Sequence, residues 1–140
     1  MQWRAHPRRD RTLNLKYGET GMRAIVVDDY APFLSALTVL LGHKTGVEVV
    51  GQADNGADGL KLIEEMRPDL VLVDFSMPGM GGVELTQRLK ASGKAPKVIV
   101  MSFQTEPECR EQALAAGADG FLVKTEIHEQ LMPLLRHIAV

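Results

Sequence analysis

Several features are scarce or missing in this sequence, and each absence excludes a class of protein. The single cysteine, Cys109, cannot form an internal disulfide, so nothing indicates an oxidising compartment. No apolar run approaches the roughly 18 residues of a membrane-spanning helix, and residues 1–20 lack the apolar stretch of a secretory signal. The net charge of −2 gives no general basic signature for nucleic-acid binding. We therefore expect a cytoplasmic protein that contacts neither membrane nor nucleic acid.

What is present indicates one globular domain preceded by a basic segment. The chain has 140 residues, of which 45% are apolar, enough for a hydrophobic core. Residues 1–20 carry five basic and two acidic residues and show no hydrophobic period. We predict a mobile, disordered leader over residues 1–21 and a folded domain over residues 22–140. An arm that binds nucleic acid or a membrane surface is the alternative for the leader.

From Met22 onward, short apolar runs alternate with helical patterns. Runs rich in valine and isoleucine predict five strands, at residues 23–28, 47–53, 69–74, 97–102 and 119–123. Apolar residues at spacings of three and four predict five helices, at residues 31–43, 57–66, 82–92, 106–116 and 126–138. Pro133 is expected to bend or interrupt the last helix.

Alternating strands and helices predict a doubly wound α/β fold. Its parallel sheet carries helices on both faces, joined by right-handed crossovers. In such folds the site lies beyond the carboxyl ends of the strands. Reactive residue types occur at those ends: Asp28 and Asp29 after the first strand, Asp74 after the third, Ser102 after the fourth and Lys124 after the fifth.

Three carboxylates at one edge of a sheet repel one another and require a cation. Mg²⁺ fits them, because it prefers oxygen ligands and keeps several waters; Mn²⁺ would serve in its place. Asp29 and Asp74 would bind the metal directly and Asp28 through water, with a backbone carbonyl from Ser76. The edge has no cluster of histidine or cysteine, which argues against zinc.

The same residues can carry out phosphoryl transfer, which depends mainly on positioning and charge stabilisation. A carboxylate such as Asp74 can act as the nucleophile and form an aspartyl phosphate. Lys124, the metal and the Ser102 hydroxyl would then hold the phosphoryl oxygens. Taken alone, each residue could be a turn, a cap or a solvated charge. Their order at four strand ends favours a functional site.

Four motifs carry a resemblance to a known family: VVDDY at 26–30, LVDFSMPGMGG at 72–82, VIVMS at 98–102 and GFLVK at 120–124. With them, residues 22–138 resemble the receiver domain of two-component response regulators. The segment ADNGADGLKLIEEMRPDLVLVDFSMPGMGG is similar to receivers that carry a LuxR-type helix-turn-helix. The resemblance implies a five-stranded parallel sheet in the flavodoxin-like order 2-1-3-4-5.

The resemblance also implies a signalling function. Asp74 would accept a phosphoryl group from a histidine kinase or a phosphotransfer protein, with the metal held by Asp28 and Asp29 and the phosphate sensed by Lys124. The chain would catalyse at most its own phosphorylation and dephosphorylation. It would control an output protein, or an output domain outside these 140 residues, through its fourth helix, fifth strand and fifth helix. A homodimer through that face is a further expectation.

Three residues would form the switch. Ser102 would move towards the phosphoryl group and Phe121 would rotate inward. Phe103 departs from the family pattern, in which this position is small. We expect its ring to slow the reaction with small phosphodonors and with water.

Other functions are alternatives to a phosphorylated receiver. A haloacid-dehalogenase-type phosphatase would need a second aspartate at the position of Ser76. A cobalamin-binding module would need a histidine after Asp74, and a flavin-binding module a phosphate loop rich in serine or threonine. A degenerate receiver, acting as an interaction module without phosphorylation, is the main alternative.

Overall fold

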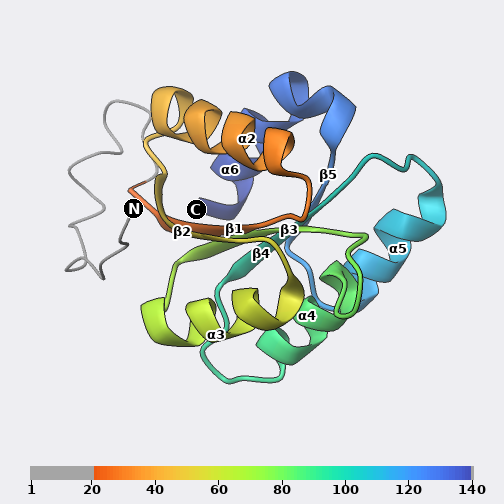
Figure 1. Cartoon of the computed structure of the whole chain (residues 1–140). Coiled ribbons are helices and arrows are strands. Elements are labelled where there is room, and N and C mark those ends of the chain that lie inside the picture. Colours follow the sequence, from red (N-terminus) through yellow and green to blue (C-terminus); the bar gives the residue numbers. More distant parts are fainter. Residues whose placement is uncertain (1–20, 140) are drawn as a thin grey trace.

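A five-stranded parallel sheet forms the centre of the protein, whose structure is a computed structural model that describes residues 21–139 (Figure 1). The expected leader therefore lies outside the described residues, apart from Gly21. The strand order is β2-β1-β3-β4-β5, which confirms the predicted topology. The strands are β1 (Arg23–Val27), β2 (Glu48–Ala53), β3 (Leu70–Asp74), β4 (Lys97–Ser102) and β5 (Gly120–Val123).

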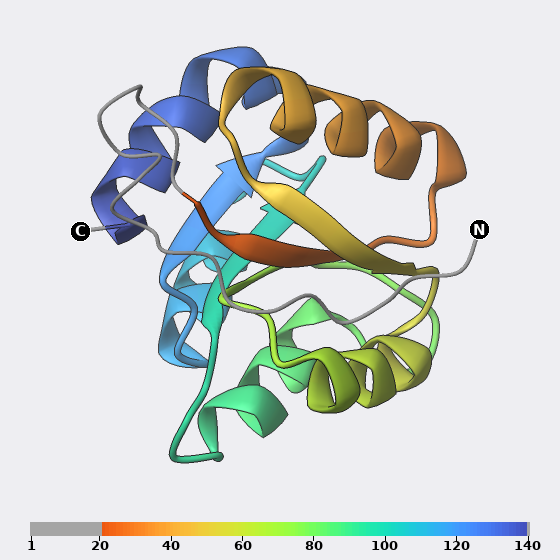
Figure 2. The same ribbon diagram turned by 90° about the vertical axis from the view of Figure 1, so that its left-hand side faces the viewer.

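Helices cover both faces of the sheet, as predicted. Residues of the helices pack into two separate cores, one on each face of the sheet, and the two views of the ribbon show helices on both sides (Figures 1 and 2). The first face carries α2 (Ala31–Lys44) and α6 (Ile127–Ala139); the second carries α3 (Gly56–Met66), α4 (Gly82–Lys90) and α5 (Pro107–Ala115). A short 3-10 helix, η1 (Lys124–Glu126), joins β5 to α6.

The apolar runs in the sequence are continuous because both faces of the strands are buried. In β1, Ala24 and Val26 pack in the core under α2 and α6, whereas Ile25 and Val27 pack in the opposite core. The side chains of a strand alternate between faces, so each strand feeds two cores at once. Apolar layers therefore cover both faces of the sheet, and the polar residues of the predicted site lie at the carboxyl ends of the strands.

Pro133 lies inside α6, which runs from Ile127 to Ala139 without interruption. The helix is therefore not interrupted at this proline, and the alternative expectation of a bend stays a prediction. Proline removes one donor and leaves the carbonyl of Glu129 without its helical partner. Both Pro133 and Glu129 are exposed, so water can hydrate that carbonyl. Over residues 21–139, no helix has the length and apolar character that crossing a membrane requires.

Candidate phosphorylation site

The acidic pair after β1 divides into a buried and an exposed carboxylate. Asp28 has no exposed surface, whereas Asp29 is exposed. The Asp28 backbone N–H donates to the Ala53 carbonyl at 3.0 Å, which extends the pairing of β1 with β2 by one residue. The Asp28 Oδ1 atom accepts from the Tyr30 backbone N–H at 2.9 Å. This turn fixes the Asp28 side chain under the start of α2.

Asp74 is the last residue of β3 and is 6% exposed. The next backbone N–H, of Phe75, donates to the Met101 carbonyl at 2.7 Å, so the end of β3 stays paired with β4. The first turn of α4 then returns onto it, and a Cβ added at Gly82 would lie 2.5 Å from the Asp74 carbonyl oxygen. Glycine is needed there because any side chain would displace the backbone of Asp74.

Lys124 joins the two buried carboxylates. Its Nζ atom lies 2.6 Å from Asp28 Oδ2 and 3.0 Å from Asp74 Oδ1. The residue follows β5 directly, and only 3% of it is exposed. The structure therefore brings together the residues that the sequence placed at the ends of the first, third and fifth strands.

The site contains more negative than positive charge. Oxygen atoms of Asp28, Asp29 and Asp74 lie within 4.8 Å of one another, and the Lys124 ammonium contacts two of these residues, Asp28 and Asp74. Burial raises the pKa of Asp74 to about 6 against the opposing effect of Lys124, with Asp28 and Asp29 adding to the increase. The carboxylate is thus mostly ionised at pH 7 but only at a cost in free energy.

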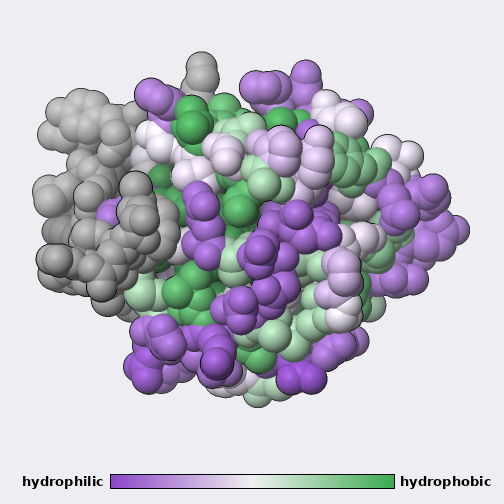
Figure 3. Space-filling view, viewed as in Figure 1, coloured by the Kyte–Doolittle hydropathy of each residue, from purple (hydrophilic) through white to green (hydrophobic). Residues whose placement is uncertain are grey.

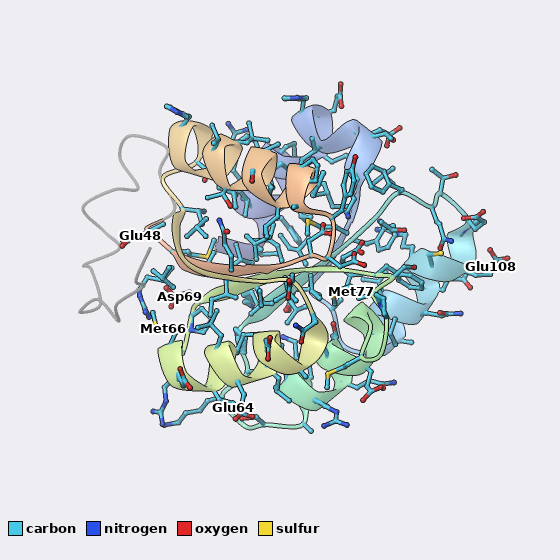
Figure 4. All side chains as sticks on the ribbon, viewed as in Figure 1. Glu48, Glu64, Met66, Asp69, Met77 and Glu108 are labelled. Atoms are coloured by element: carbon cyan, nitrogen blue, oxygen red, sulfur yellow. The ribbon has the colours of Figure 1, made fainter. Side chains whose placement is uncertain are left out.

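This donor set fits a hard divalent cation. Mg²⁺ prefers oxygen ligands, and the three carboxylates have oxygen atoms within 4.8 Å of one another, near enough to share one ion. The exposed Asp29 leaves the cluster open to solvent on one side. Ser76, the predicted carbonyl ligand, is exposed in the loop that follows β3. Met77 is labelled in this loop in Figure 4.

Ser102 ends β4 and is 2% exposed. Its Oγ atom accepts from the Gln104 backbone N–H at 2.9 Å. The hydroxyl proton is therefore available to an acceptor, such as a phosphoryl oxygen. Phe121, the second residue of the neighbouring strand β5, is already buried with 8% exposure, in the core that contains Cys109 and Ala113. The predicted inward rotation of this ring stays a prediction.

Two aromatic rings lie against the Lys124 ammonium, and the sequence predicted neither contact. The Nζ atom lies 4.7 Å from the ring centroid of Phe103 and 4.5 Å from that of Phe33. Phe103 was singled out in the sequence, but Phe33 was assigned only to the apolar face of a helix. The sequence signal that could have indicated this contact is position, because Phe33 and Tyr30 follow the acidic pair within five residues.

Comparisons with known proteins agree with this geometry. The family model described as the response regulator receiver domain matches residues 24–136. The response regulator GacA of Pseudomonas aeruginosa is 38% identical over 117 residues, which cover 84% of this chain and 55% of GacA. The chain spans about half the length of the curated relatives it matches.

Two solved structures extend the comparison. A DNA-binding response regulator of the LuxR family from Staphylococcus aureus gives a TM-score of 0.80 at 28% identity, over 85% of this chain and 99% of that one. The receiver domain of the histidine kinase CKI1 from Arabidopsis thaliana, complexed with Mg²⁺, gives a TM-score of 0.74 at 29% identity. That match covers 86% of this chain and 94% of the CKI1 chain.

Proposed function

The chain belongs to the family of response regulator receiver domains, and from this premise we propose that it is a phosphorylation-dependent switch with Asp74 as the acceptor. The predicted resemblance is confirmed, and a LuxR-family regulator is among the proteins it matches. The observation that carries the proposal is a buried strand-end carboxylate, Asp74, in contact with a buried ammonium, Lys124, inside an acidic cluster. The rival phosphatase, flavin and cobalamin functions find no support in this family.

In the proposed reaction, the donor is a phosphohistidine of a kinase or phosphotransfer protein. An Asp74 carboxylate oxygen forms a bond to phosphorus while the bond from phosphorus to the imidazole nitrogen breaks. The imidazole leaves with the electron pair. Lys124, 3.0 Å from Asp74 Oδ1, is placed to stabilise the charge that gathers on the transferred oxygens. Ser102 would donate its hydroxyl proton to one of them.

Asp28, Asp29, Asp74 and the Ser76 carbonyl would hold Mg²⁺ or Mn²⁺. When bound, the ion supplies positive charge that screens the carboxylates and the phosphoryl oxygens from one another. Support comes from the donor set and from the Mg²⁺ complex of the CKI1 receiver. The chain's own residues provide the nucleophile and the fixed ammonium.

We further propose that the signal leaves through the surface of α5, β5 and α6, which are the fourth helix, fifth strand and fifth helix of the prediction. A groove of about 660 Å³ lies there, and Phe121 and Val123 of β5 line it together with Arg110 and His137. The outer surface over α5 is hydrophilic (Figure 3), as its exposed Glu108 indicates. Phe121 therefore connects the switch to a surface that an output protein, an output domain or a second copy of the chain could bind. Such a switch would act in the cytoplasm.

Intact-mass analysis tests the proposal. The chain is incubated with acetyl phosphate and Mg²⁺, or with a phosphorylated histidine kinase, and compared with Asp74→Asn. Asp54→Asn is the matched control, since Asp54 also follows a strand, β2, but is not one of the three clustered acids. We expect one phosphoryl adduct in the wild type and in Asp54→Asn, dependent on Mg²⁺, and none in Asp74→Asn. No adduct from either donor would instead support a degenerate receiver that acts by binding alone.

A further inference from the structure

The ammonium of Lys124 lies between two carboxylates and two aromatic rings. Its Nζ atom lies 2.6 Å from an oxygen of Asp28 and 3.0 Å from one of Asp74, and the centroids of Phe33 and Phe103 are 4.5 and 4.7 Å away. A cation within about 6 Å of a ring centroid is attracted to the ring face. The Lys124 side chain is 1% exposed, so carboxylates and rings together exclude water from it.

Phe103 is held in this position by other rings. It packs edge-on against Phe33 at a centroid distance of 6.0 Å and against Tyr30 at 6.3 Å, with interplanar angles of 70° and 75°. We call these three residues the aromatic cover. It joins the loop after β4 to the start of α2. Yet Phe103 and Tyr30 remain 52% and 53% exposed. A half-exposed ring buries little apolar area, so core packing alone does not explain its placement.

The position of the cover matters for a phosphorylated Asp74. The phosphoryl oxygens would bind Lys124, whose Nζ atom also lies over the rings of Phe33 and Phe103. An ion pair that is shielded from water is stronger than an exposed one. The rings of Phe33 and Phe103 carry no hydroxyl or amide group that could orient an attacking water.

We propose that Phe103, supported by Phe33, is a positioning residue that seats Lys124 against Asp74 and sets the lifetime of the phosphoryl group. This inference rests on the proposed phosphorylation of Asp74. The step that the cover slows is hydrolysis. A water oxygen forms a bond to phosphorus, the bond between phosphorus and the Asp74 oxygen breaks, and its electron pair returns to the carboxylate. The water proton passes to solvent, and inorganic phosphate is the product.

Four variants of the full chain test whether the aromatic ring of residue 103 is required or whether apolar bulk suffices. Phe103→Ala removes both, Phe103→Leu keeps apolar bulk without a π face, and Phe103→Tyr keeps the ring. Leu114→Ala is the matched control, because Leu114 is an exposed apolar residue on α5 outside the site. Each chain is phosphorylated with acetyl phosphate and Mg²⁺, freed of donor, and followed by intact mass as the adduct decays.

We expect decay to be faster in Phe103→Ala and Phe103→Leu by about three- to thirtyfold, the range that a desolvated cation–π contact supports. Phe103→Tyr should restore the wild-type rate within about twofold, and Leu114→Ala should not change it. Decay in Phe103→Leu at the wild-type rate would overturn the proposal, because bulk alone would then suffice. An unchanged rate in Phe103→Ala would overturn it as well.

A second measurement needs no phosphorylation, so it distinguishes failure of this inference from failure of the proposed function. The Lys124 Nζ atom lies over both rings, so we expect protons on the methylene next to it to show upfield ring-current shifts in NMR spectra of the unmodified chain. The shifts should be lost in Phe103→Leu and kept in Phe103→Tyr. Identical Lys124 shifts in Phe103→Leu and wild type would overturn the cation–π contact even if the chain never accepts a phosphoryl group.

Discussion

Charged residues are arranged differently at the two edges of the sheet: the amino edge, where the strands begin, and the carboxyl edge, where they end. At the amino edge, Asp119 Oδ2 accepts from Lys90 Nζ at 2.7 Å and from the Val98 backbone N–H at 2.8 Å. At the carboxyl edge, Asp28 and Asp74 share one ammonium, and a third carboxylate lies beside them. Figure 4 labels Asp69 at the amino edge and Met77 beyond the carboxyl edge. The Lys90–Asp119 pair is balanced, whereas the cluster at the carboxyl edge carries more negative than positive charge.

The difference distinguishes a structural ion pair from a functional one. Lys90 and Asp119 are each about a quarter exposed and complete their hydrogen bonds within the chain. Asp28 and Asp74 are more buried and share a single ammonium, an arrangement that lowers stability unless a cation or a new group compensates. Natural proteins tolerate such local costs where function requires them. Replacing equivalent residues at the two edges tests this comparison.

The largest effect should come from removing the cation at each edge. Lys124→Met leaves two buried carboxylates without a counter-charge, which we expect to lower the free energy of unfolding by about 4 kcal/mol at pH 7 without metal. Lys90→Met should lower it by about 1 kcal/mol, because Asp119 is partly solvated and keeps the Val98 N–H. Urea unfolding followed by circular dichroism measures both.

Addition of Mg²⁺ sharpens the same experiment. It should restore part of the stability lost in Lys124→Met, since a divalent cation can neutralise the same carboxylates. It should leave the deficit of Lys90→Met relative to wild type unchanged. Equal losses in the two variants, or equal responses to Mg²⁺, would contradict the idea that the edges differ.

A smaller effect on stability is expected from a methyl group placed at either edge. Gly82→Ala would put a Cβ 2.5 Å from the Asp74 carbonyl oxygen, and Gly117→Ala would force alanine to a φ of +105° beside Lys90. Each should cost about 2–3 kcal/mol, the first by overpacking and the second by backbone strain. Only Gly82→Ala moves the backbone of the acceptor, so it alone should slow phosphorylation of Asp74, by about tenfold or more.

Intact-mass time courses with acetyl phosphate measure the phosphorylation rates of Gly82→Ala and Gly117→Ala, and urea unfolding measures their stabilities. Gly117→Ala controls for lost stability, because it lies at the far edge. A similar loss of phosphorylation rate in both variants would mean that stability, rather than the position of Asp74, governs the reaction.

The sequence predicted the carboxyl edge better than the cover above it. Asp28, Asp74, Ser102 and Lys124 were placed correctly because parallel strands bring their carboxyl ends together whatever the side-chain details. The contact of Phe33 with Lys124 depends on how the first turn of α2 is oriented, which apolar periodicity does not determine. The sequence also left open whether Pro133 bends or interrupts the last helix, because the cost of a helical proline depends on whether water reaches the freed carbonyl.

The smallest expected change in stability comes from neutralising one acid at each edge. The change should be stabilising at the carboxyl edge and destabilising at the amino edge. Burial raises the pKa of Asp74 from 3.8 to about 6, so the folded chain binds a proton more tightly than the unfolded chain. Wild-type stability should therefore fall as pH rises from about 4 to about 6 and stay lower above that range. Asp74→Asn removes this loss and should stabilise the metal-free chain by about 2 kcal/mol at pH 7, with no gain below pH 4.

At the amino edge, Asp119→Asn should destabilise the chain by about 1 kcal/mol, because it weakens charge-assisted hydrogen bonds to Lys90 and Val98. Urea unfolding at pH 4, 5, 6 and 7 in the presence of a chelator compares the variants with wild type. If Asp74→Asn proved no more stable than wild type at pH 7, Lys124 alone would neutralise the cluster. The need for a cation at this edge would then have no energetic basis.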